Sequence, residues 1–195
     1  MDENEILEIA QKNNGYLYKD LVKKNNIAYT TISKMAKKGL LTKVASGIYI
    51  TSSGVEDEFF INSIRFSNLV YSGETAIFLN GLSNKQFPEL EAVVPYGTTV
   101  PKIEGYKVRQ SRRKNVGLGV SFVETPFGNK VKCYDKERCI CELIANPDHY
   151  DFEDRVYAIR EYNQFYLNFE KLYSYAAELN VLEKVKNVFE VIGWN

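Results

Sequence analysis

The chain has 195 residues, which fits one large domain or a small domain followed by a medium one. Hydrophobic residues make up 45% and charged residues 26%, and the formal net charge is zero, so the chain does not bind polyanions over its whole surface. The charge is unevenly distributed, however. Residues 16–51 contain seven lysines and one acid, and such a local excess favours phosphate binding.

The first elements are predicted from apolar residues that recur at helical spacing. We expect helices over residues 2–13, 17–24 and 28–38, with Gly39 ending the third because a glycine reaches the positive φ of a helix C-terminus without strain. Residues 41–50 then alternate as a β-hairpin that turns at its centre. Three helices followed by a hairpin are typical of a winged helix-turn-helix.

The outer faces of these elements carry the candidate DNA-binding residues. In a winged helix the third helix enters the major groove, where hydroxyls contact base edges and lysines contact phosphates. Four to six such phosphate contacts predict a salt slope of roughly −4 to −5. The predicted set is Lys19, Lys23, Tyr29, Thr30, Thr31, Ser33, Lys34, Lys37, Lys38, Lys43 and Ser46.

A polar joint at residues 51–54 marks the expected boundary between a DNA-binding domain, residues 1–52, and an α+β domain, residues 55–195. The second domain begins with a helix over residues 56–68 and another that Ser72 caps. The period then shifts towards two, which predicts a small, mostly antiparallel sheet. Its strands lie within residues 90–135, and helices follow at residues 135–145, 152–166, 169–180 and 181–192.

Cysteine and histidine usage argues against a metal site. Cys133, Cys139 and Cys141 contain no C-x-x-C pair, and with His149 they match no zinc pattern. We therefore expect buried free thiols in a reducing cytosol. The acidic start of the chain is unlike a signal peptide, and no stretch approaches the ~20 apolar residues of a membrane span. We expect a soluble cytoplasmic protein with no cofactor, metal or membrane partner.

The order of motifs resembles a known family. A G-x-Y wing lies at residues 47–49, a characteristic segment at residues 71–82, and a D-K-E-R helix start at residues 135–138. Together they resemble the AbiEi abortive-infection antitoxins of type IV toxin–antitoxin systems, over essentially the whole chain. One departure is Asn80, where that family more usually has histidine.

The resemblance implies two separable functions. The N-terminal domain is implied to bind inverted repeats in double-stranded DNA upstream of its own operon and to repress it. The C-terminal domain is implied to neutralise a nucleotidyltransferase-like toxin in phage defence without forming a stable complex with it.

Catalytic signatures are missing from the sequence. No acid is followed two positions later by a lysine, so the Glu-x-Lys or Asp-x-Lys pattern of restriction-type nucleases is absent from the sequence, and there is no phosphate-binding glycine loop or nucleophile elbow. The G-x-G at residues 117–119 lacks a third glycine and precedes a predicted strand. We expect a binding protein and not an enzyme.

A second basic feature comprises Lys107, Arg109, Arg112, Arg113 and Lys114. It is a solvated loop between strands, a second phosphate contact, or a surface for RNA or an acidic partner. Guanidinium groups suit phosphates because their fork binds two oxygens at once.

For the whole chain, the alternative is a winged helix that contacts protein instead of DNA. The DNA-binding interpretation requires Lys23, Lys34, Lys37 and Lys43 on one continuous surface.

Overall fold

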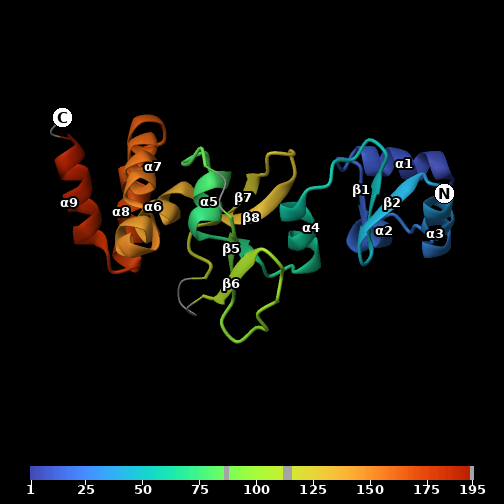
Figure 1. Ribbon diagram of the computed structural model, residues 1–195, viewed down its shortest axis with the longest axis horizontal. Helices are drawn as coiled ribbons and strands as arrows, with labels where there is room; N and C mark the ends of the chain where they lie inside the picture. The colour runs from blue at the N-terminus through green and yellow to red at the C-terminus, as the bar shows by residue number, and fades with distance from the viewer. Residues whose placement is uncertain (86–87, 112–115, 194–195) are drawn as a thin grey trace. The chain divides into compact units, whose positions relative to one another are not determined.

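The structure is a computed structural model and describes residues 1–85, 88–111 and 116–193 (Figure 1). It is a mixed α+β fold, as the sequence predicts. Two compact units divide it: unit 1 comprises residues 1–67 and 124–130, and unit 2 comprises residues 68–123 and residues from 131 onwards. The joint predicted at residues 51–54 therefore lies inside unit 1.

Unit 1 pairs helices with a small antiparallel sheet of strand order β1-β3-β2. Its β2–β3 hairpin aligns Leu41 with Thr51 and Lys43 with Tyr49, and a bulge follows Lys43. The elements are α1 (Glu3–Gln11), β1 (Tyr16–Tyr18), α2 (Lys19–Lys24), α3 (Tyr29–Lys37), β2 (Leu41–Ala45), β3 (Ile48–Thr51) and α4 (Glu58–Arg65).

The helix predicted over residues 17–24 is wrong at its start. Tyr16–Tyr18 forms β1, which pairs antiparallel with β3 so that Tyr16 lies opposite Ile50, and α2 begins only at Lys19. Gly15, at φ +84°, turns the chain out of α1 with its Cα against the backbone of Gly54. This strand forms because it pairs with β3, which lies far along the chain. The spacing of apolar residues within a short segment cannot predict such a pairing.

The core of unit 1 has two parts. One lies among the three N-terminal helices and includes Ile6, Ile32 and Met35. The other lies on the sheet, where Ile48 and Ile50 pack with Ile61 of α4. Because α4 completes the second cluster, the compact unit extends beyond the wing to residue 67.

Unit 2 is built on a five-stranded sheet of order β6-β5-β4-β8-β7. Its strands are β4 (Val70–Tyr71), β5 (Leu90–Val94), β6 (Tyr106–Gln110), β7 (Val120–Glu124) and β8 (Lys130–Tyr134). Its helices are α5 (Gly73–Leu79), α6 (Lys136–Ala145), α7 (Phe152–Phe165), α8 (Phe169–Glu178) and α9 (Leu182–Gly193), with a 3₁₀ turn at Pro147–His149.

The sheet is mixed, and the prediction of a mostly antiparallel sheet is wrong. Strands β5 and β6 are parallel, with Leu90 opposite Tyr106, and β4 and β8 are also parallel, through Tyr71 and Cys133. Strands β4 and β5 pair antiparallel, with Val70 opposite Val93. Alternation predicts a strand but not its direction, which depends on how each connection returns the chain.

The C-terminal helices agree with the prediction to within two residues at each end. Helix α6 is largely buried, with Ile140 and Cys141 fully inside and Leu143 1% exposed. Among the described residues, no helix combines the length and apolarity needed to cross a membrane.

Candidate nucleic-acid interface

Helix α3 is defined by local signals at both ends. Before it, Asn26 adopts φ +52° and the Ile27 amide donates to the Val22 carbonyl at 3.0 Å, which closes the turn after α2. After it, Gly39 adopts φ +76° and the Leu40 amide donates to the Met35 carbonyl at 3.0 Å. This hydrogen bond is typical of a glycine-terminated helix, and the predicted stop at Gly39 is confirmed.

The two faces of α3 differ in chemistry. Ile32 and Met35 are 1% and 0% exposed and pack into the N-terminal core. The stripe opposite them at helical spacing is exposed and carries only hydroxyls and ammonium groups. Its members are Thr30, Ser33, Lys34 and Lys37.

Two further predicted contacts flank this stripe. Tyr29, the first residue of α3, is 55% exposed, so its ring and hydroxyl face solvent. Thr31 is only half-buried and lies towards the edge of the stripe. The predicted hydroxyl-rich tip is therefore accessible, with Thr31 its least exposed member.

Lys38 differs from the other predicted lysines because it already has a partner. Its ammonium lies 2.6 Å from a carboxylate oxygen of Glu3 in α1. Both side chains are well exposed, and such a pair contributes about 0–1 kcal/mol, so a phosphate can compete for the lysine. Lys38 directly follows α3, and a phosphate that binds it would have to displace Glu3.

The remaining predicted contacts of unit 1 are all exposed. Lys19 and Lys23 lie on α2, Lys43 lies on β2, and Ser46 lies at the hairpin turn beside Gly47, which adopts φ +71°. Sequence reasoning missed Thr42, exposed on β2 next to Lys43. Strict alternation predicts that Lys43 faces solvent and Thr42 does not. A bulge breaks this alternation, so the sequence pattern does not show that both residues are exposed.

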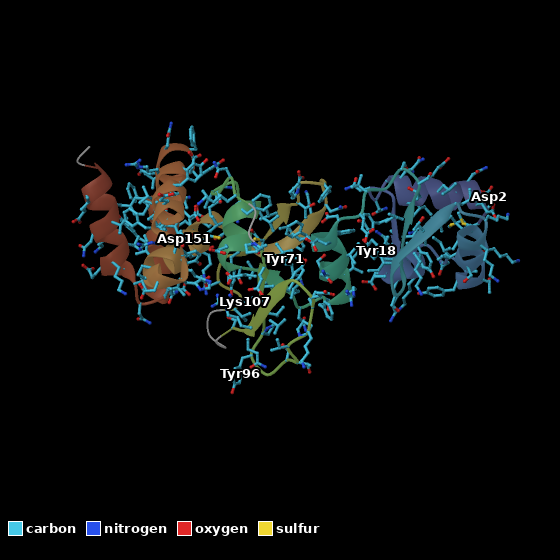
Figure 2. The ribbon with its side chains drawn as sticks, viewed as in Figure 1. Asp2, Tyr18, Tyr71, Tyr96, Lys107 and Asp151 are labelled. Atoms are coloured by element: carbon cyan, nitrogen blue, oxygen red, sulfur yellow. The ribbon has the colours of Figure 1, made fainter. Side chains whose placement is uncertain are left out.

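The second basic feature is only partly described. Lys107, which Figure 2 labels, and Arg109 are exposed on β6 of unit 2. Lys107 forms a 3.5 Å ion pair with Glu89. Arg112, Arg113 and Lys114 lie outside the described residues. The structure thus brings two of the five cations onto one strand of unit 2.

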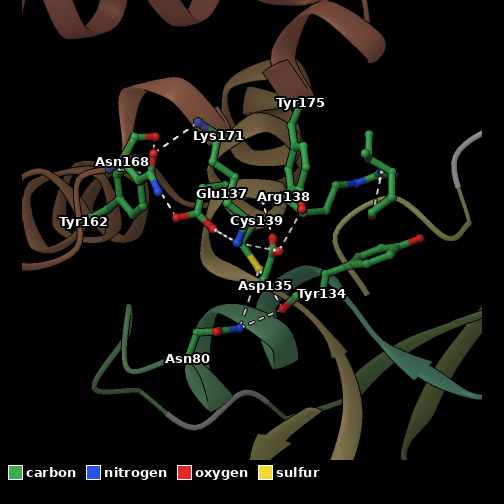
Figure 3. A network of polar contacts seen from close by, with 11 residues as sticks. Asn80, Tyr134, Asp135, Glu137, Arg138, Cys139, Tyr162, Asn168, Lys171 and Tyr175 are labelled. Atoms are coloured by element: carbon green, nitrogen blue, oxygen red, sulfur yellow. Dashed lines mark hydrogen bonds and ion pairs between the residues drawn. The ribbon is translucent and has the colours of Figure 1, made fainter. Parts of the chain in front are cut away.

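The D-K-E-R segment begins α6 and forms a polar network that Figure 3 shows. The Lys171 ammonium of α8 donates to Asp135 Oδ2 at 3.0 Å and to Glu137 Oε2 at 2.8 Å. The hydroxyls of Tyr175 and Tyr162 donate to Asp135 and Glu137 at 3.2 and 3.3 Å. These contacts join the start of α6 to α7 and α8.

Asn80 also has a structural position. It is 7% exposed, and its amide donates to the Ala76 carbonyl at 2.7 Å and to the Tyr134 carbonyl at 2.8 Å (Figure 3). The side chain therefore closes the C-terminus of α5 and ties it to the end of β8.

The cysteines are free and buried. Burial raises the pKa of Cys141 to about 12, and it also raises the pKa of Cys133 and of Cys139. They are therefore protonated thiols at neutral pH and poor nucleophiles. Within residues 1–85, 88–111 and 116–193, no cluster of three or more histidine, cysteine or acidic residues could hold a metal.

The fold and these surfaces define an α+β protein with one basic helix–hairpin unit. No protein-family profile and no curated protein matches the chain. Among solved structures, the crystal structure of the RV2827C protein from Mycobacterium tuberculosis is similar, with a TM-score of 0.52 and 10% sequence identity. The similarity covers 91% of this chain and 74% of that one, and it shows the fold alone.

Proposed function

We propose that unit 1 is a winged helix-turn-helix that binds double-stranded DNA, with α3 in the major groove. The observation that carries the proposal is the stripe on α3, where Thr30, Ser33, Lys34 and Lys37 are exposed and no acid intervenes. Packing against the core requires only the apolar face of α3. It does not require that the opposite face carry hydroxyl and ammonium groups without any acid.

The order of elements in unit 1 supports this proposal. Helix α2, a tight turn and α3 are followed at once by the β2–β3 hairpin, and β1 completes a three-stranded sheet. In a winged helix the second helix of the motif reads the groove and the hairpin contacts the adjacent backbone. Lys43 and Ser46 are exposed where the wing would meet phosphates.

We assign different roles to the side chains on α3. Lys34 and Lys37 neutralise phosphates and supply most of the affinity. Thr30, Ser33 and Tyr29 contact base edges, where short hydroxyls discriminate weakly, so DNA shape must add to specificity. Lys19 and Lys23 of α2 add phosphate contacts at the flank.

For the biological role, we propose a transcriptional repressor that autoregulates a toxin–antitoxin operon of the AbiEi type. This step rests on the motif order at residues 47–49, 71–82 and 135–138. Unit 2 would then carry the antitoxic activity against a nucleotidyltransferase-like toxin without a stable complex. Lys107 and Arg109 on β6 are candidates for a second phosphate contact or for that activity.

The test is a footprint and gel-shift series on DNA immediately upstream of the protein's own coding sequence. The wild type is compared with Lys34→Ala/Lys37→Ala over a range of salt concentrations. Removing two phosphate contacts should flatten the salt slope by about 1.8 and weaken binding at low salt. Lys102→Ala/Lys184→Ala makes the same change in net charge on exposed lysines of unit 2 and should leave both quantities unchanged.

Equal loss in the two double variants would mean that net charge alone drives binding and that α3 is not the reader. A wild-type protein that protects no upstream DNA at low salt would overturn the proposal altogether.

A further inference from the structure

Unit 2 contains a cavity that the proposed DNA-binding function does not use. It has a volume of about 360 Å³ and is bounded by β5, β6, β8, α6 and the turn between α8 and α9. That volume is in the range of small-molecule sites in proteins. The chemistry of its wall determines what class of molecule it fits.

Tyr134 provides a buried polar group that lines the cavity. The residue is 1% exposed, and the side chain of Ser111 interacts with its hydroxyl. Burial raises the pKa of the phenol, so at neutral pH the group is a hydrogen-bond donor. An anionic acceptor inside the cavity would give this buried donor a hydrogen bond to a charged group, which contributes about 1.5–3 kcal/mol.

Two arginines give the cavity a positive wall. Arg138 is 4% exposed, lies over the Tyr134 ring at 4.6 Å and is paired with Glu142 at 2.9 Å. Arg109 is exposed at the mouth and forms no ion pair with any described residue. With Arg138 balanced by Glu142, Arg109 leaves the lining with a net positive charge, which favours an anionic ligand.

The rest of the lining suits a flat organic body. Val93, Ala145, Leu179 and Val181 form apolar walls, and the amides of Gln110 and Asn146 supply polar groups. A simple inorganic anion would use only the charged part of this surface.

We propose that this cavity binds a small phosphate ester of mononucleotide size, with its phosphate at Arg109 and Tyr134 and its base against the apolar walls. A guanidinium fork binds two phosphate oxygens, and a further oxygen remains for the phenol. The aliphatic side chains can cover the face of a base, and the amides can pair with its polar edge. The proposal is independent of DNA binding, because no residue of α3 or of the wing lines the cavity.

The experiment is calorimetric titration of the full chain with AMP, GMP, CMP and UMP, and with inorganic phosphate as a separate arm. At least one mononucleotide should bind, and inorganic phosphate should bind more weakly because it lacks the body. Tyr134→Phe keeps the ring and removes one hydrogen bond to a charged group, so it should weaken binding by roughly tenfold or more. Arg109→Gln should do the same.

Arg160→Gln is the matched control, since Arg160 is an exposed arginine of unit 2 that does not line the cavity. The affinity of Arg160→Gln for the mononucleotide should equal that of the wild type. Melting curves show whether the Tyr134→Phe protein folds. If it does not, the test depends on Arg109→Gln, which changes an exposed side chain.

Three outcomes would overturn the proposal: no binding of any mononucleotide, equal affinity for inorganic phosphate, or binding that both cavity variants leave unchanged. Upstream-DNA binding by Tyr134→Phe should be unaltered, which separates failure of this site from failure of the proposed function.

Discussion

At the amino end of α5, a distant side chain replaces the expected local cap. Ser72 occupies the predicted N-cap position, but its hydroxyl is buried and forms no hydrogen bond among the described residues. Instead, the carboxylate of Glu91 on β5 accepts from the Glu74 amide at 3.1 Å, and His149 lies 3.0 Å from the same carboxylate. A carboxylate at a helix N-terminus also interacts favourably with the helix dipole.

This arrangement requires glycine at position 73. Gly73 has φ +57°, and a Cβ there would collide with the Glu91 carboxylate. We expect Gly73→Ala to destabilise the protein by about 3 kcal/mol, because a left-handed alanine costs about 1–2 kcal/mol and the displaced carboxylate loses its bond to the helix. Urea unfolding measures the change.

Gly105→Ala is the control for backbone strain alone. Gly105 also has positive φ, at +73°, but nothing lies within 4 Å of its missing Cβ. Gly105→Ala should lower the free energy of unfolding by only about 1–2 kcal/mol. If both variants lose the same stability, the collision with Glu91 plays no part.

At the scale of elements, one lysine joins the start of α6 to α8. Lys171 bridges Asp135 and Glu137, whose side chains are 14% and 9% exposed, while its own is 40% exposed. Partial burial acts to lower the pKa of Lys171, but the hydrogen bonds to Glu137 and Asp135 outweigh it and raise the pKa above its ordinary value. The folded state therefore favours the charged lysine.

We expect Lys171→Met to lose about 2 kcal/mol at neutral pH, less than for a fully buried pair because the lysine is partly hydrated. A raised lysine pKa stabilises the fold fully below the unfolded value of about 10.4, and that stabilisation is lost as the pH rises through the folded value. The difference in the free energy of unfolding between the wild type and Lys171→Met should therefore be constant from about pH 7 to 10 and decrease at higher pH. Urea unfolding across this range measures it.

Lys186→Met is a suitable comparison, because Lys186 pairs with Glu183, whose side chain is 80% exposed. Its effect should stay below about 0.5 kcal/mol at every pH. A Lys171→Met difference that grows at high pH would contradict the assigned sign.

At the scale of the whole molecule, unit 1 is assembled from two separate stretches of chain. Asp57, fully buried at the start of α4, accepts from the Thr125 hydroxyl at 2.6 Å and the Asn129 amide at 2.8 Å. The Asn14 amide donates to the Gly128 carbonyl at 3.1 Å. Residues 124–130 therefore belong with a unit whose other residues end at position 67.

Truncation tests this organisation. A fragment of residues 1–54 lacks Ile61 and Phe60, which pack on Tyr16 and its neighbours, and also lacks the Val55 carbonyl and Asp57 amide that bond the Tyr16 hydroxyl. We expect it to be less stable than a fragment of residues 1–67 by about 2–3 kcal/mol, from one to two apolar side chains no longer buried. Thermal and urea unfolding compare the two.

Both fragments lack residues 124–130, so the comparison isolates α4. If the two fragments are equally stable, α4 does not contribute to the stability of unit 1. The folded unit would then end at the polar joint at residues 51–54, as the sequence composition predicts.

Much of the element plan follows from local pattern. The helices of the C-terminal half, α3 with its glycine stop, and the β2–β3 hairpin are encoded by apolar spacing and turn residues within a few positions of one another. The exposed stripe on α3 follows from the same period, which is why its candidate contacts could be named. The ion pair between Lys38 and Glu3 could not be predicted in this way, because Glu3 lies on another helix.

By itself the sequence determined where most of the helices lie, that α3 stops at Gly39, and that the lysines near the wing face outwards, since these depend on short-range periodicity. Only the tertiary structure decided that residues 16–18 form a strand, that the sheet is mixed, that Glu91 caps α5 and that Tyr134 lines a cavity. Each of these depends on which distant residues meet. Such pairings are selected by the packing free energy of the whole fold, which no local window contains.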